Sequence, residues 1–229
     1  MVPALDWWAN AAIIAGPSDT ETIVKQKHFI DSHKGATFFV ILALIAIYGR
    51  WDNVAAFVYL ALHGAYGYIW ILKSRSFGDT QWEEPCSLGR GLALWGGLSM
   101  YWIAPWLICA HDVRPPAAWI GLCVFVYCFG LFYHYASDMQ KDCWLTLNPG
   151  HLLTEGLWAK VRNPNYFGEL LIYAGFSALA MHWLPLLVLA MFVAGVWLPN
   201  MRHKDASLSR YPDFAAYKAR STLFIPHLF

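Results

Sequence analysis

The feature that most constrains this chain is a series of long apolar runs, each close to the length of a membrane-spanning helix. Such a helix takes about 20 mostly apolar residues. Another short apolar segment, at 3–16, either lies in the membrane interface or forms a further span. We therefore predict an all-α fold, a polytopic transmembrane helical bundle with about six to seven spans. The six main runs lie at roughly 36–49, 54–72, 88–110, 117–136, 166–181 and 183–201.

The composition agrees with a bilayer environment. Only 14% of the residues are charged, against about a quarter in soluble domains. The chain also has 13 Trp and 12 Tyr, which concentrate at membrane–water boundaries. The net charge of +1 gives no reason to expect a nucleic-acid partner. We expect residues 1–35 to form an N-terminal cytosolic or interfacial segment, and residues 36–229 to form a single membrane-embedded domain.

The distribution of Lys and Arg predicts the orientation, because cytosolic loops carry an excess of both. Only Arg50 and Arg114 lie on one side of the predicted spans. We therefore expect a multi-pass protein with both ends of its six-helix core in the cytosol. The membrane would be the endoplasmic reticulum in a eukaryote, or the inner membrane in a bacterium. The other side holds Lys25, Lys27, Lys34, Lys73, Arg75, Arg90, Lys141, Lys160, Arg162, Arg202, Lys204, Arg210, Lys218 and Arg220.

Cysteine spacing predicts neither a metal site nor a disulfide framework, because no CxxC pair occurs. The five cysteines are Cys86, Cys109, Cys123, Cys128 and Cys143.

A first polar cluster ends the fourth predicted span. If this segment is helical, His134, Asp138 and Lys141 share one face, at i, i+4 and i+7. Polar groups at membrane depth are costly unless they serve a site or are paired. The stripe is therefore either a ligand-binding face or a helix end that emerges into water with a loose ion pair.

A second cluster opens the fifth span. Asn163 followed by Pro164 predicts a helix start with Asn as the cap. Asn165 and Glu169 then share one face, and the nearby Arg162 favours a phosphate at the helix start. Gly168 permits close approach of a backbone or a cofactor. The alternative is a capped helix whose Glu169 pairs with Arg162 or Arg202.

A third cluster follows the sixth span. Arg202 is at the expected cytosolic mouth of that span, where a guanidinium can hold a phosphate through two hydrogen bonds. Lys204, Arg210 and Lys218 are better interpreted as ordinary positive-inside anchors.

These features together resemble the C-terminal domain of the steroid 5α-reductase-like membrane reductases, over about residues 130–229. The most specific part is the segment Pro164-Asn-Tyr-Phe-Gly-Glu169. A tail closing on Phe224-Ile-Pro226 adds to the likeness. Wider relatives of that superfamily include sterol reductases and isoprenylcysteine carboxyl methyltransferases. The resemblance implies NADPH in a cytosol-facing cavity and a lipid substrate that enters from the bilayer.

The resemblance also implies roles for individual residues. Two departures from the family pattern are Asn163, where a histidine is usual, and the lack of an N-terminal glutamate for a steroid carbonyl. The second departure puts a steroid substrate in doubt. His134 stands where reductases often carry Asn. The expected cofactor-binding set is His134, Asp138, Lys141, Arg162, Asn165, Tyr166, Glu169, Arg202 and Tyr217.

The reaction itself needs a hydrogen-bond donor for the charge that develops on the lipid. His63 and Tyr66 are three residues apart on the second span and are the catalytic candidates. A role for both in core packing is the alternative.

The sequence thus favours an NADPH-dependent reductase of a carbon–carbon double bond in a lipid, either a sterol or steroid or another enone. One alternative is an S-adenosylmethionine-dependent membrane methyltransferase of the isoprenylcysteine or phospholipid type. The basic residues around Arg202 favour a phosphorylated cofactor over that methyl donor. A second alternative is a non-catalytic subunit or a lipid-binding membrane protein.

Overall fold

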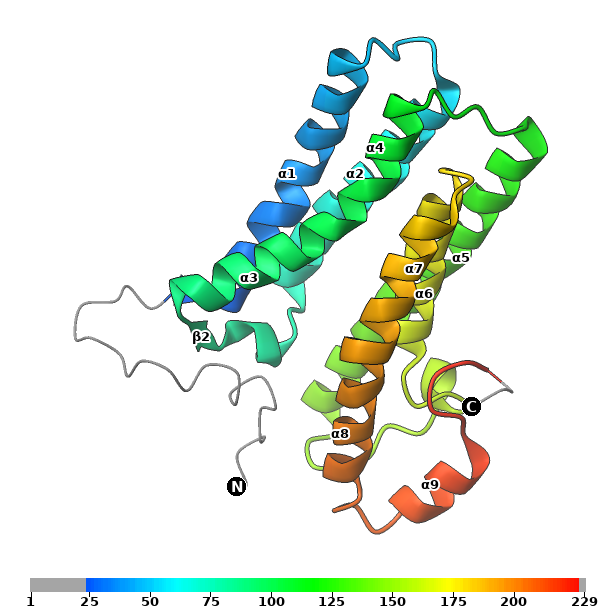
Figure 1. Ribbon diagram of the computed structural model, residues 1–229. Helices are drawn as coiled ribbons and strands as arrows, with labels where there is room; N and C mark the ends of the chain where they lie inside the picture. The colour runs from blue at the N-terminus through cyan, green and yellow to red at the C-terminus, as the bar shows by residue number, and fades with distance from the viewer. Residues whose placement is uncertain (1–23, 227–229) are drawn as a thin grey trace.

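The computed structural model describes residues 24–226, which are almost entirely helical (Figure 1). Its helices are α1 (Gln26–Ile47), α2 (Val54–Ser76), α3 (Leu88–Ser99), α4 (Ile103–Ala110), α5 (Ala117–Leu147), α6 (Pro164–Ala178), α7 (Trp183–Phe192), α8 (Leu198–Leu208) and α9 (Phe214–Arg220). Short helical turns are η2 (Thr80–Glu83), η3 (Met100–Trp102), η4 (Gly156–Trp158) and η5 (Val193–Trp197). Two short strands, β1 (Val24–Lys25) and β2 (Pro85–Cys86), pair antiparallel.

The predicted transmembrane bundle is confirmed, because five helical segments are long and apolar enough to cross a membrane. Large apolar side chains such as Phe39, Leu72 and Phe125 point outward, with exposed fractions of 62%, 63% and 59%. Such a surface suits lipid rather than water. The five segments are Gln26–Ile47, Val54–Ser76, Leu88–Ala110, Ala117–Leu147 and Trp183–Leu208. The predicted fifth span is the shorter α6, which packs against α5 and α7.

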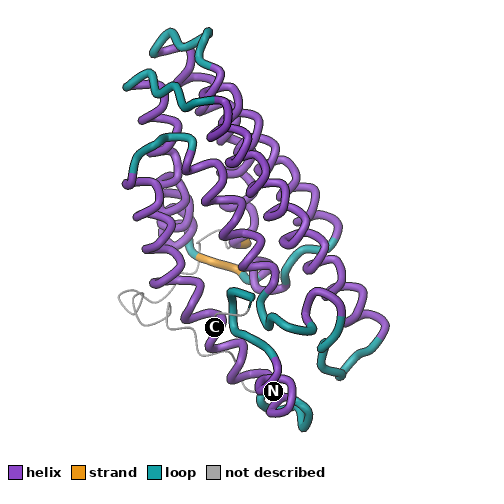
Figure 2. Tube along the Cα trace, turned by 90° about the vertical axis from the view of Figure 1, so that its right-hand side faces the viewer, coloured by secondary structure: helices purple, strands orange, loops and turns teal. Residues whose placement is uncertain are grey.

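The helices lie side by side as an elongated bundle (Figure 2). In Figure 1, α1, α2 and the α3–α4 segment form one half, and α5, α6 and the α7–α8 segment form the other. Contacts of α2 with α5 and α6, and of α4 with α7, join the halves. Residues from α2 and α6 therefore meet in the interior.

Glycines allow the closest helix contacts. A Cβ atom on Gly168 of α6 would lie 2.3 Å from the backbone nitrogen of His134 on α5. A Cβ on Gly67 of α2 would lie 2.3 Å from the carbonyl oxygen of Lys34 on α1. Small residues let helix backbones touch in membrane proteins. At Gly168 the close partner is thus a backbone, one of the two possibilities that the sequence suggested.

Two helix boundaries differ from the sequence prediction. The first helix begins at Gln26 rather than near residue 36, so Lys34 lies inside α1 and is buried. Its assignment to a cytosolic loop was wrong. The helix α5 continues to Leu147 rather than ending near 136, which places all of the first polar cluster on a helix. The segment 3–16 lies outside the described residues.

The two ends of the bundle differ in chemistry. At one end, the β1–β2 pair lies beside ion pairs from Lys25 and Lys27 to Glu83. The opposite end holds a smaller network, in which Asp112 is paired with both Arg50 and Arg114. The segments that carry most of the other basic residues, between α2 and α3, between α5 and α6, and after α8, also lie at the first end (Figure 1).

Candidate functional site

A hydrogen bond between α2 and α6 forms the centre of the candidate site. The Tyr66 hydroxyl donates to Oε1 of Glu169 at 3.1 Å. Tyr66 is fully buried and Glu169 is partly buried. A predicted catalytic residue and a predicted cofactor residue, far apart in sequence, thus meet inside the bundle.

Lys34 of α1 lies against this pair, and the sequence analysis did not identify it as a site residue. Its ammonium is 4.2 Å from the ring centre of Tyr66, 5.0 Å from that of Trp70 and 5.2 Å from that of Tyr173. It donates a hydrogen bond of 2.6 Å to the Tyr173 hydroxyl. Rings at these distances attract a cation through their electron-rich faces. An aromatic cage therefore surrounds a buried lysine.

Beside the cage, several buried polar atoms have no hydrogen-bond partner within residues 24–226. They are Nε2 of His134, the Tyr135 hydroxyl and Oδ1 of Asn165. The other ring nitrogen of His134 lies 3.1 Å from the Asn165 carbonyl oxygen. Buried polar groups are normally satisfied, so such open atoms are expected where a ligand or water binds. These open polar atoms, on α5 and at the start of α6, are candidate contacts for a polar ligand.

Asp138 lies in a group of alternating charges. It pairs with Lys73 at 2.6 Å, and Asp79 bridges Lys73 at 2.8 Å and Lys141 at 2.7 Å. Lys141 also lies 3.7 Å from Asp138. Burial would raise the pKa of the Asp79 carboxyl, but the ammonium groups of Lys141 and Lys73 outweigh it and hold that pKa well below its usual range. The sequence predicted Asp138 and Lys141 but missed the two residues that connect them.

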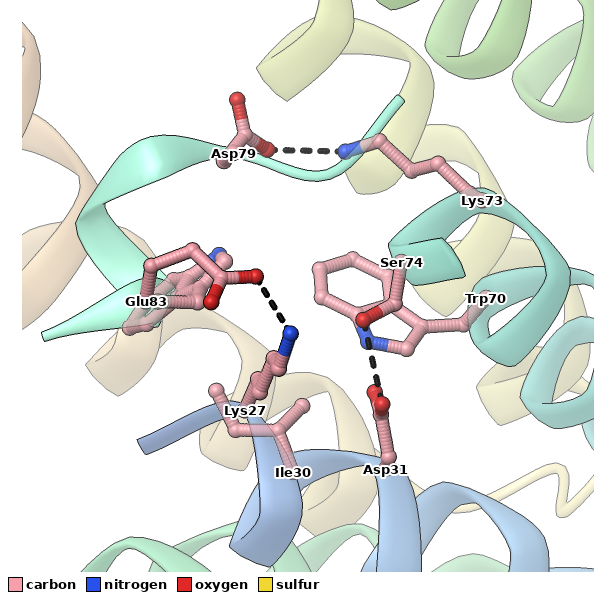
Figure 3. A pocket seen from close by; sticks show the side chains of 9 residues that line it. Lys27, Ile30, Asp31, Trp70, Lys73, Ser74, Asp79 and Glu83 are labelled. Atoms are coloured by element: carbon pink, nitrogen blue, oxygen red, sulfur yellow. Dashed lines mark hydrogen bonds and ion pairs between the residues drawn. The ribbon is translucent and has the colours of Figure 1, made fainter. Parts of the chain in front are cut away.

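A small recess lies next to this charge group, at the end of the bundle where Lys27 pairs with Glu83 (Figure 3). Trp70 and Lys73 line it from α2, and Asp79 and Glu83 line it from the loop that follows. Figure 3 shows Asp79 bonded to Lys73 and Glu83 bonded to Lys27. The recess therefore adjoins the cage through Trp70, which lines the recess and contacts Lys34.

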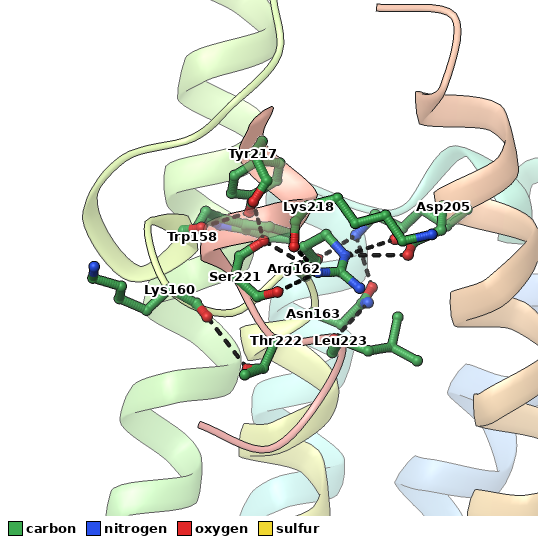
Figure 4. A network of polar contacts seen from close by, with 11 residues as sticks. Trp158, Lys160, Arg162, Asn163, Asp205, Tyr217, Lys218, Ser221, Thr222 and Leu223 are labelled. Atoms are coloured by element: carbon green, nitrogen blue, oxygen red, sulfur yellow. Dashed lines mark hydrogen bonds and ion pairs between the residues drawn. The ribbon is translucent and has the colours of Figure 1, made fainter. Parts of the chain in front are cut away.

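Arg162 and Tyr217 hold the C-terminal tail in place (Figure 4). Nε of Arg162 donates to both carboxylate oxygens of Asp205, at 3.0 and 3.1 Å. Nη1 of Arg162 donates to the carbonyl and hydroxyl oxygens of Ser221. The Tyr217 hydroxyl donates to the carbonyl oxygen of Trp158, and burial raises the pKa of Tyr217 to about 12. Both predicted cofactor residues are thus engaged in contacts within the protein.

The start of α6 differs in detail from the prediction. Helix α6 does begin at Pro164, but the Asn163 side chain does not cap it. Instead, Asn163 donates to the Leu223 carbonyl and accepts a hydrogen bond from Lys204. The Lys204 ammonium also lies 4.3 Å from the Trp158 ring centre. Lys204 is therefore an internal contact as well as a positive charge, and its partners lie in the loop that precedes α6.

The remaining predicted residues are His63, Tyr166 and Arg202. His63 is buried, 3.0 Å from the Tyr59 hydroxyl, and its ring stacks on Phe176. It forms no hydrogen bond with Tyr66, so its observed contacts are those of a core residue. Tyr166 packs beside Trp197 at a ring distance of 5.7 Å. Arg202 is exposed and forms no hydrogen bond or ion pair with any residue in 24–226.

The fold and the buried polar site define a multi-pass integral membrane protein with an internal cluster of charged and aromatic residues. The chain belongs to the family described as "Protein of unknown function (DUF1295)", whose model matches residues 97–221. That match includes Asp138 and Glu169 but begins after Lys34 and Tyr66. No curated protein matches the chain.

Proposed function

We propose that this protein is a membrane-embedded, NADPH-dependent reductase that saturates a carbon–carbon double bond conjugated to a carbonyl group in a lipid. The observation that carries the proposal is the Tyr66–Glu169 hydrogen bond, a hydroxyl donor and a carboxyl group held together inside an apolar bundle. A donor in a water-poor interior is worth more than one in water, which suits it to stabilise developing charge.

When bound, NADPH supplies the hydride. Hydride addition to the β-carbon of an enone places negative charge on the carbonyl oxygen. The Tyr66 hydroxyl is the proposed donor to that oxygen. Protonation of Glu169 reverses its hydrogen bond with Tyr66, so that Glu169 donates to the phenol oxygen and the phenol proton is free for the substrate. Glu169 thus orients the Tyr66 hydroxyl and leaves the phenol proton available to the substrate oxygen.

The residues near this pair suit a nucleotide cofactor. Asn165 and His134 offer unpartnered polar atoms, while Lys73 and Lys141 are ammonium donors balanced by Asp79 and Asp138. Arg202 is an exposed guanidinium, the group best shaped to hold a phosphate. The family match at 97–221 overlaps the segment that resembles steroid 5α-reductase-like proteins. We propose that this end of the bundle, which carries most of the basic residues, faces the cytosol.

A parallel binding measurement on detergent-purified protein tests the proposal. NADPH, NADH and S-adenosylmethionine are titrated separately into the wild type, Arg202→Ala and the matched control Arg210→Ala. The control guanidinium is also exposed but hydrogen-bonds Ser207 and Tyr211. We expect saturable NADPH binding that is weakened about tenfold or more by Arg202→Ala alone.

Other outcomes would contradict the proposal in different ways. Saturable binding of S-adenosylmethionine alone would favour the methyltransferase. Binding of none of the three would favour a non-catalytic membrane protein.

A further inference from the structure

Two buried lysines in this bundle differ in how their charge is balanced. Lys34 and Lys73 are both almost inaccessible, with residue exposures of 3% and 4%. Lys73 forms ion pairs with two carboxylates, Asp79 and Asp138. Lys34 forms no ion pair with any residue in the described part of the chain. A buried charge at membrane depth that forms no ion pair marks a functional site by default.

The hydrogen bonding of Lys34 is also incomplete. An ammonium group has three donors. Within residues 24–226, the Lys34 ammonium donates one hydrogen bond, to the Tyr173 hydroxyl at 2.6 Å. The rings of Tyr66, Trp70 and Tyr173 balance part of its charge but accept no ordinary hydrogen bond. The remaining donors therefore suit an oxygen atom supplied by a ligand.

The position of the ammonium indicates which oxygen that is. Lys34 contacts the ring of Tyr66, whose hydroxyl bonds Glu169. Glu169 and Tyr173 are four residues apart on α6, so they lie on the same face of that helix. Lys34 lies about 12 Å along α1 from the helix start, at 1.5 Å per residue. It is thus inside the bundle, beside Tyr66, and Trp70 lies between it and the recess that Trp70 also lines.

We infer that Lys34 is a further catalytic residue, whose ammonium donates a hydrogen bond to the carbonyl oxygen of the lipid substrate beside the Tyr66 hydroxyl. This inference rests on the proposed function. The β-carbon gains a hydride with its electron pair from NADPH, which is oxidised to NADP⁺. The π pair of the carbon–carbon double bond becomes the new bond between the α-carbon and the carbonyl carbon. The π pair of the carbonyl group moves onto its oxygen, where Lys34 and Tyr66 stabilise the negative charge. Water then supplies the proton to the α-carbon, and Lys34 keeps its own protons.

A catalytic role and a purely structural role for Lys34 predict different changes in thermal stability when Lys34 is replaced by Met. Replacement of buried charged groups by apolar residues of similar size is often neutral or stabilising when no ion-pair partner is left behind, and Lys34 forms no ion pair within residues 24–226. Lys34→Met should therefore fold with a thermal midpoint at or above that of the wild type. If Lys34 served only to hold the bundle together through Tyr173, this variant would unfold at a lower temperature.

The test compares the wild type, Lys34→Met, Lys34→Arg and the control Lys27→Met. Lys27 lies on the same helix but pairs with Glu83 at the end of the bundle. The first readout needs no turnover: the infrared carbonyl band of a long-chain cyclohexenone with a ¹³C carbonyl, bound in the presence of NADP⁺. We expect a shift to lower frequency in the wild type, Lys34→Arg and Lys27→Met, and loss of that shift in Lys34→Met.

The second readout is steady-state reduction of the same enone. We expect kcat to fall about 100-fold in Lys34→Met, as for the loss of one oxyanion donor. Lys34→Arg should recover part of that loss and Lys27→Met should match the wild type. An unshifted carbonyl band in the wild type, or an unchanged kcat in Lys34→Met, would overturn the inference.

The two readouts separate this inference from the proposed function. If the wild type shows a carbonyl shift that Lys34→Met abolishes but reduces no enone with NADPH, the reductase proposal fails and Lys34 still binds the carbonyl oxygen. If the wild type reduces the enone and Lys34→Met does so equally well, the role of Lys34 fails alone.

Discussion

The Tyr66 hydroxyl on α2 donates a 3.1 Å hydrogen bond to Oε1 of Glu169 on α6, so one contact joins the two halves of the bundle at the candidate site. Tyr66 also contacts the Lys34 ammonium from α1 with its ring. Three helices thus contribute one side chain each to this centre. The role of Tyr66, the packing of α5 on α6, the attachment of the tail and the Glu83 ion pairs can each be tested separately.

Tyr66→Phe removes the hydroxyl and keeps the ring over Lys34. We expect kcat for enone reduction to fall about 100-fold, because one positioned donor is lost. NADPH affinity should remain unchanged. The control is Tyr68→Phe, at an exposed position (43%) on the same helix. Equal turnover of Tyr66→Phe and the wild type in proteoliposomes would remove Tyr66 from the mechanism.

Gly168→Ala should destabilise the contact between α5 and α6. The added Cβ would lie 2.3 Å from the His134 backbone nitrogen, so the helices must separate. Overpacking of this kind costs about 1–3 kcal/mol. The thermal midpoint in detergent should fall for Gly168→Ala and stay unchanged for Gly121→Ala, whose Cβ would meet no atom within 4 Å. A midpoint for Gly168→Ala at the wild-type value would show that the helices are not in contact there.

Arg162→Met should release the tail. The change leaves Asp205 without its buried partner and removes the donor to Ser221. Loss of one member of a buried ion pair costs about 3–5 kcal/mol. Limited proteolysis should therefore cut within 209–226 much faster than in the wild type. The control, Lys160→Met, changes an exposed side chain of the same loop. Equal cleavage rates in Arg162→Met and Lys160→Met would contradict this role.

The Glu83 ion pairs should stabilise the fold near neutral pH, and this stabilisation should be lost in acid. Hydrogen bonds from Lys27 and Lys25 lower the pKa of Glu83 from 4.5 to about 2. A carboxyl with a lowered pKa in the folded protein stabilises the fold above its ordinary pKa, and this stability is lost as pH falls toward the folded value. The wild type should therefore exceed Glu83→Gln in thermal midpoint above pH 4.5, and the difference should disappear toward pH 2.

Glu84→Gln is the matched control for this pH series, because Glu84 is exposed and its side chain forms no ion pair within residues 24–226. Its midpoint should follow that of the wild type at every pH. A difference in thermal midpoint between the wild type and Glu83→Gln that does not change with pH would show that the ion pairs do not contribute to stability.

The bundle could be predicted from sequence because apolar run length directly measures whether a helix can cross a bilayer. The boundaries were less certain. A helix continues past its apolar core wherever polar residues find partners in the fold, as Lys34 does in α1 and Asp138 does in α5. Counting charges cannot separate a lysine in a loop from one inside a helix. The spacing of Ile30, Lys34, Thr37 and Ile41 on one face was the available signal for Lys34.

The candidate site was predictable only in part, for a similar reason. Asp138, Asn165 and Glu169 are conspicuous as polar residues beside apolar runs. Their partners are distant in sequence: Lys73 for Asp138 and Tyr66 for Glu169. The sequence alone predicts that Arg162 is available to a ligand, because nothing in its local sequence shows that the tail folds back onto it. These partners are known only once the tertiary structure shows which distant residues are in contact.

The most direct test of the central claim is isotope transfer from NADPH carrying two deuterium atoms at C4 of the nicotinamide to a long-chain enone, by purified protein in lipid vesicles. The account predicts one deuterium at the β-carbon of the saturated product, with the yield reduced about 100-fold in Tyr66→Phe and unchanged in Tyr68→Phe. A product without deuterium, or no product while the vesicles bind S-adenosylmethionine and methylate the lipid, would contradict it.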